Sequence, residues 1–334
     1  MKKNILFLLL AALLLLPGCD SDTEYNNSRR DNFEDLWRIM DQNYCFFELK
    51  GVDWDAIHDK YSVLITDTMS QDSLFNVMGD MLAELKDGHT NLISSFNVSR
   101  YWSWYEEYAP NYYEDIRDNY LGTDYRIAGG MKYRKLAEGR VGYIYYGSFA
   151  SGVSETNLDY ILSYFKDCKA LIIDVRDNSG GMLNYSDQIA SRFVKEKTLT
   201  GYMSHKTGHG HNDFSKPYPM YISPSDRVQW LRPVIVLTNR RCFSATNAFV
   251  QTMRMLPNVT IMGDRTGGGS GFPFNSELPN GWSVRFSACP MYDSEMNCTE
   301  FGIDPDIPVS MTMSDILKGY DTIIDTAIRT SLGL

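Results

Sequence analysis

The segment "PVIVLTNRRCFSATNAFVQTMRML" (residues 233–256) joins an apolar strand to a helix. The run "PVIVLT" lacks polar alternation, which indicates a strand buried on both faces. The part that begins at Ser244 is typical of a helix. A serine at such a junction is exposed, and the adjoining helix N-terminus favours developing negative charge beside it. The plainer alternative is that Ser244 only caps the helix.

The second half of the chain repeats this alternation. Strands are expected at "RVGYIYYGSF" (140–149), "KALIIDVR" (169–176) and "NVTIMGD" (258–264), with a helix near 155–166. Apolar strands that alternate with helices predict a largely parallel sheet and an α/β core. A final helix is expected near 314–332.

The first half is helical in pattern. "DNFEDLWRIMDQNY" and "SQDSLFNVMGDMLAELKDGHT" place apolar residues at helical spacing. Asp31 is expected to cap the first of these helices and Ser70 or Ser73 the second, which should end near Asp87 and Gly88.

Residues 101–120 contain eight aromatic side chains. This segment is expected to be a connector between two domains, with its aromatics packed against them. A surface that holds a ligand is the alternative, because tyrosine and tryptophan combine an apolar body with a polar tip.

The amino terminus resembles an export signal. Two lysines precede the apolar run Ile5–Leu16, which is too short to span a membrane comfortably. The following "LPGC" resembles the lipobox of bacterial lipoproteins, in which Cys19 becomes the lipidated first residue. An ordinary signal peptide with a chance cysteine is the alternative. We expect an exported protein, lipid-anchored to the bacterial cell envelope on the periplasmic side or the cell surface.

The expected organisation has five parts. They are a signal peptide (1–18), a lipid-anchored tether (19–30), a helical N-terminal domain (31–98), an aromatic-rich connector (99–135) and an α/β core (136–334). The fold class is therefore α/β in the core and α+β overall.

Composition excludes several classes of function. With 334 residues and 43% hydrophobic content, the chain can bury a sizeable core. A formal net charge of −10 argues against nucleic acid as a partner. An odd number of cysteines beyond Cys19, without CxxC spacing, argues against zinc, although Cys289 and Cys298 could pair.

A histidine-rich segment, "SHKTGHGHND", leaves a metal site as an alternative for His205, His209 and His211. Its glycine and polar neighbours favour a surface hairpin or loop instead. We expect neither a metal nor a cofactor.

Five motifs follow one another in a characteristic order. They are "LKDGHT" (85–90), "DVRDNSGG" (174–181), "TNRRCFSATNAFV" (238–250), "GDRTGGGSG" (263–271) and "EFGIDPDI" (300–307). Together they resemble the tail-specific or carboxyl-terminal processing serine peptidases, including the core of the tricorn peptidase. The resemblance spans roughly Asp31 to the end of the chain and implies a core similar to the crotonase/Clp fold.

The resemblance also implies roles for residues around Ser244, the implied nucleophile. The oxyanion hole would use the backbone N–H of Ala245 and one N–H from the pair Gly180 and Gly181, where the absent Cβ lets the backbone approach a bound carbonyl. Ser270 lacks the strand–serine–helix setting and is a poor rival.

The residue that activates Ser244 is the main question. Many members of the family carry a lysine in the Gly-rich turn, where this chain has Gly269, and no lysine occurs between Lys216 and Lys318. The tricorn-like branch instead uses a histidine from the upstream helical region and a glutamate beyond the turn. His89 and Glu300 match this pattern.

Histidine suits the role, because its unperturbed pKa near ~6.5 leaves it available as a neutral base around pH 7. Glu300 would hold the imidazole tautomer and stabilise its cation. The tricorn-like pattern has a serine just before the histidine, where this chain has Gly88, so Glu300 must reach His89 directly, through Thr90 or through water. The alternative for His89 is a purely structural residue at the end of a helix.

We therefore predict a serine peptidase that acts on peptides or unfolded proteins outside the cytoplasm. Only about residues 95–135 are available for an inserted PDZ domain, too few for a full one at the usual ~50–200 residues per domain. A non-catalytic lipoprotein that binds a peptide or apolar ligand in the same cleft is the alternative, supported by the absent lysine, Gly88 and Asn247. An acyl-transfer enzyme for a non-peptide ester is a third.

Overall fold

The computed structural model describes residues 27–334. The expected signal peptide, the lipidation site Cys19 and most of the tether lie outside the described residues. Within residues 27–334 none of the helices is long and apolar enough to cross a bilayer.

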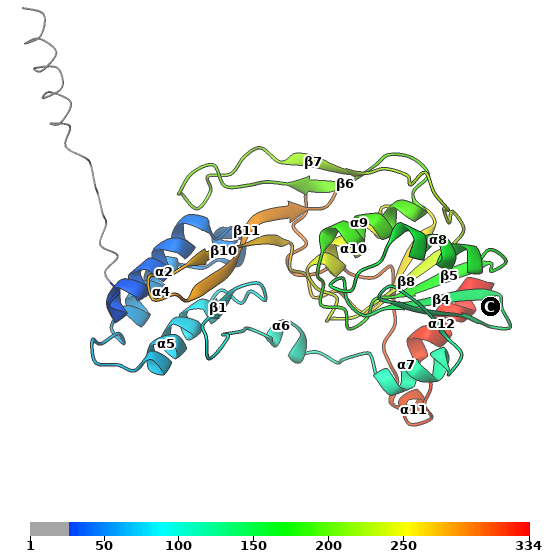
Figure 1. The fold of residues 1–334 in the computed structure, drawn as a ribbon, viewed down its shortest axis with the longest axis horizontal. Coiled ribbons are helices and arrows are strands. Elements are labelled where there is room, and N and C mark those ends of the chain that lie inside the picture. The colour runs from blue at the N-terminus through cyan, green and yellow to red at the C-terminus, as the bar shows by residue number, and fades with distance from the viewer. Residues whose placement is uncertain (1–26) are drawn as a thin grey trace, which may run out of the picture.

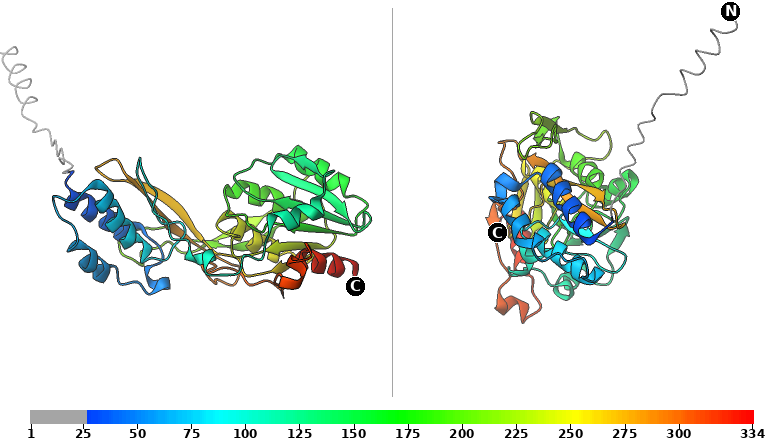
Figure 2. Two further views of the ribbon diagram at one scale, coloured as in Figure 1. Left: turned by 90° about the horizontal axis from the view of Figure 1, so that it is seen from below. Right: turned by 90° about the vertical axis from the view of Figure 1, so that its left-hand side faces the viewer.

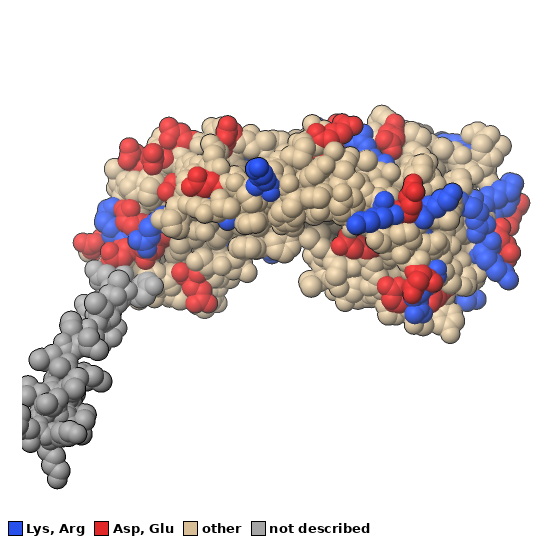
Figure 3. Space-filling view, turned by 90° about the horizontal axis from the view of Figure 1, so that it is seen from above, with Lys and Arg blue, Asp and Glu red and all other residues tan. Residues whose placement is uncertain are grey.

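The chain forms two lobes joined by long strands (Figure 1). One lobe contains the N-terminal helices α2 (Arg29–Asn43), α3 (Phe47–Lys50), α4 (Trp54–Ser62) and α5 (Gln71–Ala83). The other contains a seven-stranded sheet with helices on both faces. On the face in Figure 3, charged side chains of both signs gather at the two ends, and the stretch between them is mostly uncharged.

The core sheet has the strand order β12-β9-β8-β5-β4-β3-β2. The strands are β2 (Arg126–Ala128), β3 (Met131–Leu136), β4 (Val141–Tyr146), β5 (Ala170–Asp174), β8 (Val234–Thr238), β9 (Val259–Gly263) and β12 (Ile307–Pro308). From β4 to β12 neighbouring strands are parallel, as the sequence predicted, and β2 and β3 add an antiparallel edge. Because β2 and all but the last residue of β3 lie within residues 99–135, the core sheet begins earlier than residue 136.

Helices cover both faces of this sheet. The helices of one face are α8 (Glu155–Tyr164), α9 (Leu183–Ala190), the 3-10 turn η2 (Ser191–Phe193) and α10 (Ala245–Arg254), and those of the other are α7 (Glu114–Leu121) and α12 (Thr322–Leu332). Alternate strand residues point to the two faces, so Ile173 packs with the first group and Ile172 with the second. The sheet is therefore the middle of three layers.

A second sheet links the lobes and was not expected from the sequence. It runs β1-β11-β6-β7, with β10 paired to β11. Its strands are β1 (Asn91–Ile93), β6 (Thr198–Met203), β7 (Tyr218–Ile222), β10 (Gly271–Glu277) and β11 (Ser283–Tyr292). The β10–β11 hairpin reaches from the core lobe to the N-terminal helices (Figure 2), where Trp282, Val284 and Phe286 join their apolar core.

Several helix ends differ from those that the sequence predicted. Ser28, not Asp31, caps α2, and Asp31 is its partner in a capping box. Ser70 caps α5 as expected, but the helix ends at Ala83, before the predicted end near Asp87 and Gly88. The predicted C-terminal helix is divided into α11 (Met313–Ile316) and α12, because Gly319 between them has a φ of 74°.

Candidate active site

Ser244 lies where the chain leaves β8 and enters α10. Its backbone has φ 58° and ψ −122°, a region that costs about 1–3 kcal/mol for a residue with a Cβ. Its N–H donates to the Gly268 carbonyl at 2.9 Å, which ties this turn to the Gly-rich turn. The Ser244 hydroxyl makes no capping bond to α10, so the plain N-cap alternative is wrong.

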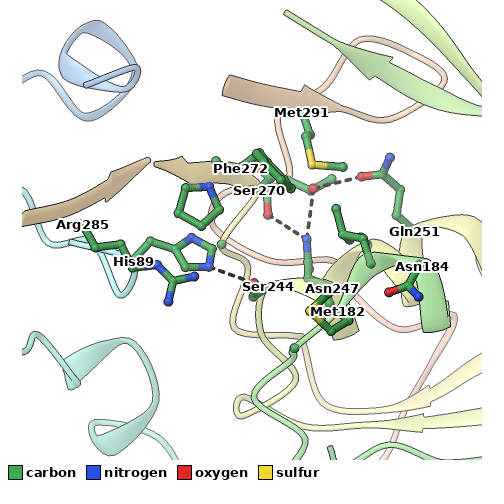
Figure 4. Close-up of a pocket in the computed structure, with 18 residues that line it drawn as sticks. His89, Met182, Asn184, Ser244, Asn247, Gln251, Ser270, Phe272, Arg285 and Met291 are labelled. Atoms are coloured by element: carbon green, nitrogen blue, oxygen red, sulfur yellow. Dashed lines mark hydrogen bonds between the residues drawn. The ribbon is translucent and has the colours of Figure 1, made fainter. Parts of the chain in front are cut away.

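The structure brings His89 to Ser244. His89 follows α5 in the N-terminal lobe, and its Nε2 lies 2.8 Å from Ser244 Oγ (Figure 4). The imidazole packs against the Phe243 ring at 4.7 Å between centroids, and Trp104 from the aromatic-rich connector stacks on Phe243 at 4.3 Å. These rings fix the orientation of the imidazole.

Burial makes His89 neutral at pH 7. It lowers the pKa of His89 to about 4, with Arg285 and Lys50 acting in the same direction and the Asp87 carboxylate opposing them. A neutral imidazole whose Nε2 faces a hydroxyl accepts its proton, which places the ring hydrogen on Nδ1. The arrangement can therefore activate Ser244 without a lysine.

Two backbone N–H groups beside Ser244 are free to bind an oxyanion. Within residues 27–334 neither Gly181 nor Ala245 donates its N–H to a protein acceptor, and both residues line the cleft. The Gly180 N–H instead donates to the Asn178 side chain at 3.0 Å. A Cβ on Gly180 would lie 2.9 Å from the Ser244 Cβ, so glycine is required there for packing.

The structure does not bring Glu300 into contact with His89. Glu300 Oε1 lies 2.9 Å from the Lys50 ammonium, and Oε2 accepts the Ser270 N–H at 2.9 Å. Lys50 also pairs with Asp87 Oδ2 at 3.4 Å. Among the described residues His89 Nδ1 has no protein hydrogen-bond partner, so the direct Glu300–His89 contact is not formed, and Glu300 instead belongs to a buried Asp87–Lys50–Glu300 chain.

Packing around Gly88 explains why no bridge forms at that position. A Cβ on Gly88 would lie 2.7 Å from Trp104 Nε1 and 2.8 Å from the Phe243 ring. The space that a serine would need is therefore filled by the rings that orient His89. Thr90 supplies no bridge either, because its hydroxyl has no partner in the described part of the chain.

The two carboxyl groups of the Asp87–Lys50–Glu300 chain have pKa values shifted in opposite directions. Burial and the Asp87 charge raise the pKa of Glu300 to about 7, although Lys50 opposes them. Burial also favours neutral Asp87, but Lys50 and His89 outweigh it and hold the pKa of Asp87 below its ordinary value. Asp87 accepts the His89 backbone N–H at 2.8 Å and the Tyr44 hydroxyl at 2.8 Å. Asp87 is thus the carboxylate that acts on His89.

The Gly-rich turn cannot hold a lysine in this chain. Gly269 has a φ of 78°, and a Cβ there would lie 2.5 Å from the Phe243 ring. Gly268 has a φ of 83°, and its Cβ would lie 1.8 Å from the Glu300 carbonyl oxygen. Phe243 therefore occupies the place that a base from this turn would need.

A cleft of about 460 Å³ opens beside Ser244 and His89 (Figure 4). Its wall combines apolar residues such as Met182, Phe272 and Met291 with the amides Asn184 and Gln251. Behind Ser244, Asn247 donates to the Thr299 hydroxyl at 3.1 Å, and that hydroxyl donates to Gln251 at 3.0 Å. These bonds fix the wall of the cleft.

The remaining candidates lie outside this arrangement. His211 pairs with Asp41 at 2.6 Å and packs on Phe47, so it joins the β6–β7 hairpin to the N-terminal lobe. No group of three or more potential metal ligands occurs within residues 27–334. Cys289 and Cys298 are free thiols, and Ser270 Oγ faces Cys298 at 3.4 Å.

Sequence reasoning missed the residues that support the site from a distance. Lys50 and Arg285 come from separate segments, and nothing in their local pattern marks them. Trp104 lies in the aromatic-rich segment 101–120, which was expected to pack against the domains, but its place beside the active site was not predicted. Asp87 lies inside the quoted motif "LKDGHT" and could have been found there. Asn178, which receives the Gly180 N–H, likewise lies in "DVRDNSGG".

Known proteins resemble this chain over most of its length. The peptidase family S41 profile matches residues 140–309, about half of the chain, and the tricorn protease C1 domain profile matches residues 25–83. A crystal structure of a candidate peptidase from Parabacteroides merdae ATCC 43184 is 66% identical, covering 92% of this chain and 98% of that one, with a TM-score of 0.89.

More distant relatives share the fold or a segment. The structure of mature CPAF has a TM-score of 0.70 at 13% identity, which is a likeness of fold alone. The tricorn protease of Thermoplasma acidophilum is 26% identical over 221 residues, which is 64% of this chain and 19% of that protein. The chain spans about a fifth of the length of the curated relatives it matches. From the profile match over half of its length and the 66% identical structure, the chain belongs to peptidase family S41.

Proposed function

We propose that the protein is a serine peptidase with Ser244 as nucleophile and His89 as general base and acid. The observation that carries the proposal is the 2.8 Å approach of His89 Nε2 to the hydroxyl of a serine held in strained backbone at a strand-to-helix turn. A serine so placed, beside a neutral base and free backbone donors, is suited to acyl transfer.

The reaction follows from these groups. His89 Nε2 takes the hydroxyl proton as Ser244 Oγ bonds to the scissile carbonyl carbon. The carbonyl oxygen, now negative, accepts hydrogen bonds from the Gly181 and Ala245 N–H groups. His89 then protonates the departing amine, the carbon–nitrogen bond breaks, and water releases the acyl group from Ser244 by the same steps.

Asp87 and the chain behind it support the imidazolium that forms in each step. A low pKa makes His89 a weak base, so a nearby negative charge lowers the cost of protonating it. Lys50 keeps Asp87 charged, and Glu300 in turn holds Lys50 in place. We propose that Glu300 acts through this chain and not by touching the imidazole.

Hydrolysis of reduced and alkylated casein tests the proposal. Wild type should release new amino termini and Ser244→Ala should release none. Ser163→Ala, which changes an exposed side chain of α8, should match wild type. Casein hydrolysis by Ser244→Ala at the wild-type rate would refute the assignment of Ser244 as the nucleophile. Binding of peptide without hydrolysis by wild type would support the non-catalytic alternative.

We also propose that the enzyme is an exported lipoprotein anchored through Cys19 and acting on peptides or unfolded proteins at the cell envelope. Its support is the lipobox-like "LPGC" after a short apolar run. Palmitate should label the wild type but not Cys19→Ala. Equal labelling of both would contradict the anchor.

A further inference from the structure

The cleft beside Ser244 carries a single charged side chain at neutral pH. Its lining residues include no aspartate, glutamate or lysine, and His89 is neutral there. Arg285 is the exception, and it stays protonated because a guanidinium keeps its proton throughout the range in which proteins fold. An otherwise neutral, largely apolar cleft thus holds one cation.

Arg285 has no partner within the described residues. It lies on β11, opposite Asn91 of β1 and Asn275 of β10, and its half-buried side chain makes no ion pair or hydrogen bond within residues 27–334. The carboxylate whose charge acts on the Arg285 guanidinium is Asp87, and Asp87 is already paired with Lys50.

Other buried arginines show how this chain normally satisfies a guanidinium. Arg176 contacts Asp174 at 2.7 Å and Asp321 at 3.0 Å. Arg117 pairs with Glu114 at 2.7 Å. Burying a guanidinium without a counterion costs free energy, and half-buried Arg285 lacks such a counterion where a substrate would lie.

Figure 4 places Arg285 beside His89, with Met182, Asn184 and Gln251 on the other side of Ser244. The cleft therefore has a cationic end and an end of apolar and amide groups, and the nucleophile lies between them. A peptide bound across Ser244 would place different chemistry on the two sides of the scissile bond.

We propose that Arg285 binds a substrate carboxylate a few residues at most from the scissile bond. The inference rests on the proposed peptidase function and adds its substrate class. A planar guanidinium with free N–H groups matches a carboxylate through two parallel hydrogen bonds. The net charge of −10 repels acidic peptides in general, so a local cation is needed to hold one.

The carboxylate can come from an acidic side chain or from the carboxyl terminus of the substrate. Both present the same two oxygens to Arg285, so the shared chemistry defines the site. The two sources can be distinguished by how their charge is removed. Amidation neutralises a carboxyl terminus, whereas replacing glutamate with glutamine neutralises a side chain.

The test begins with the bond that wild type cuts best in reduced and alkylated casein, mapped by mass spectrometry. Peptides around that bond are made with Glu or Gln at each of the three positions on either side. A second set ends two residues beyond the bond as a free acid or an amide. The kcat/KM of each peptide is measured for wild type, Arg285→Gln, Arg285→Lys and the control Arg126→Gln, which removes the same charge from exposed edge strand β2.

We expect wild type to prefer one carboxylate peptide over its neutral partner by about 10- to 100-fold, as for a hydrogen-bonded charge pair. Arg285→Gln should abolish that preference, which is read as the ratio between charged and neutral peptides within each variant, so that a change in overall activity cancels. Arg285→Lys should restore the preference in part, because lysine keeps the charge but not the two parallel N–H donors. Arg126→Gln should behave as wild type.

Two results overturn the inference differently. If wild type cuts the peptides but Arg285→Gln keeps the same ratio between charged and neutral partners, Arg285 does not read a carboxylate and the proposed peptidase function stands. If wild type cuts none of the peptides or casein, both proposals fail together.

Discussion

Replacing Lys50 with methionine should destabilise the protein in a pH-dependent way. The Lys50 ammonium is buried between Asp87 and Glu300, at 3.4 Å and 2.9 Å from their oxygens. Methionine keeps much of the volume but leaves two buried carboxylates without their cation. Removing one partner of a buried ion pair costs about 3–5 kcal/mol of unfolding free energy, which we expect at pH 8.

The sign of the pH dependence follows from Glu300. Its pKa of about 7 lies above its ordinary value of 4.5, so its contribution to stability is fully present below pH 4.5 and is lost as the pH rises through 7. Without Lys50 the pKa of Glu300 rises further, so the protein loses more unfolding free energy as the pH is raised. The deficit of Lys50→Met should therefore be at least about 1 kcal/mol smaller at pH 5 than at pH 8.

Urea unfolding at the two pH values measures this difference. Lys60→Met is the matched control, because Lys60 makes an exposed ion pair with Glu84 and its loss should leave the urea midpoint nearly unchanged at either pH. Adding Glu300→Gln to Lys50→Met should recover part of the stability at pH 8. A deficit below 1 kcal/mol for Lys50→Met, or one that does not change with pH, would refute the buried Asp87–Lys50–Glu300 chain.

Three further predictions concern Ser244, His89 and Gly88. Ser244→Gly should be about 1 kcal/mol more stable than Ser244→Ala in urea unfolding, because glycine tolerates a φ of 58° and alanine does not; the reverse order would argue against strain. Burial lowers the pKa of His89 from 6.5 to about 4, so its contribution to stability is present above pH 6.5 and is lost as the pH falls through 4. Between pH 7 and 4 the unfolding free energy of wild type should fall by about 3 kcal/mol relative to that of His89→Gln. Parallel curves of unfolding free energy against pH for the two proteins would contradict the burial. Gly88→Ser, which restores the tricorn-like pattern, should lower the thermal midpoint and the activity together, because its Cβ would displace Trp104 and Phe243; an active and stable variant would show that the rings do not exclude a side chain.

Local patterns in the sequence predicted the parts of the fold that depend on neighbouring residues. Apolar runs without alternation marked β4, β5, β8 and β9, and the parallel order of these strands followed from the helices between them. The strand-to-helix junction at Ser244 was visible for the same reason. The motif order predicted that His89 and Ser244 would meet although they are far apart in sequence.

Contacts between distant segments without a motif could not be predicted. The second sheet joins β1 to β11, and neither segment reveals its partner by its pattern. Lys50 reaches Glu300 from a four-residue helix, and Glu300 pairs with Lys50 and not with His89. The rings of Trp104 and Phe243 fill the space beside Gly88, which only the folded packing reveals. Glu300 was therefore placed in the right region with the wrong neighbour.

The rate at which a fluorophosphonate labels Ser244 reports the nucleophile and its base without a peptide substrate. Intact mass and peptide mapping should find one adduct, on Ser244, and the rate should rise with pH through about 4 and then stay level across neutral pH. His89→Gln should label at least about 100-fold more slowly, as expected for loss of a general base. Labelling of His89→Gln at the wild-type rate, or a rate that climbs only near the ordinary lysine pKa of ~10, would contradict the account.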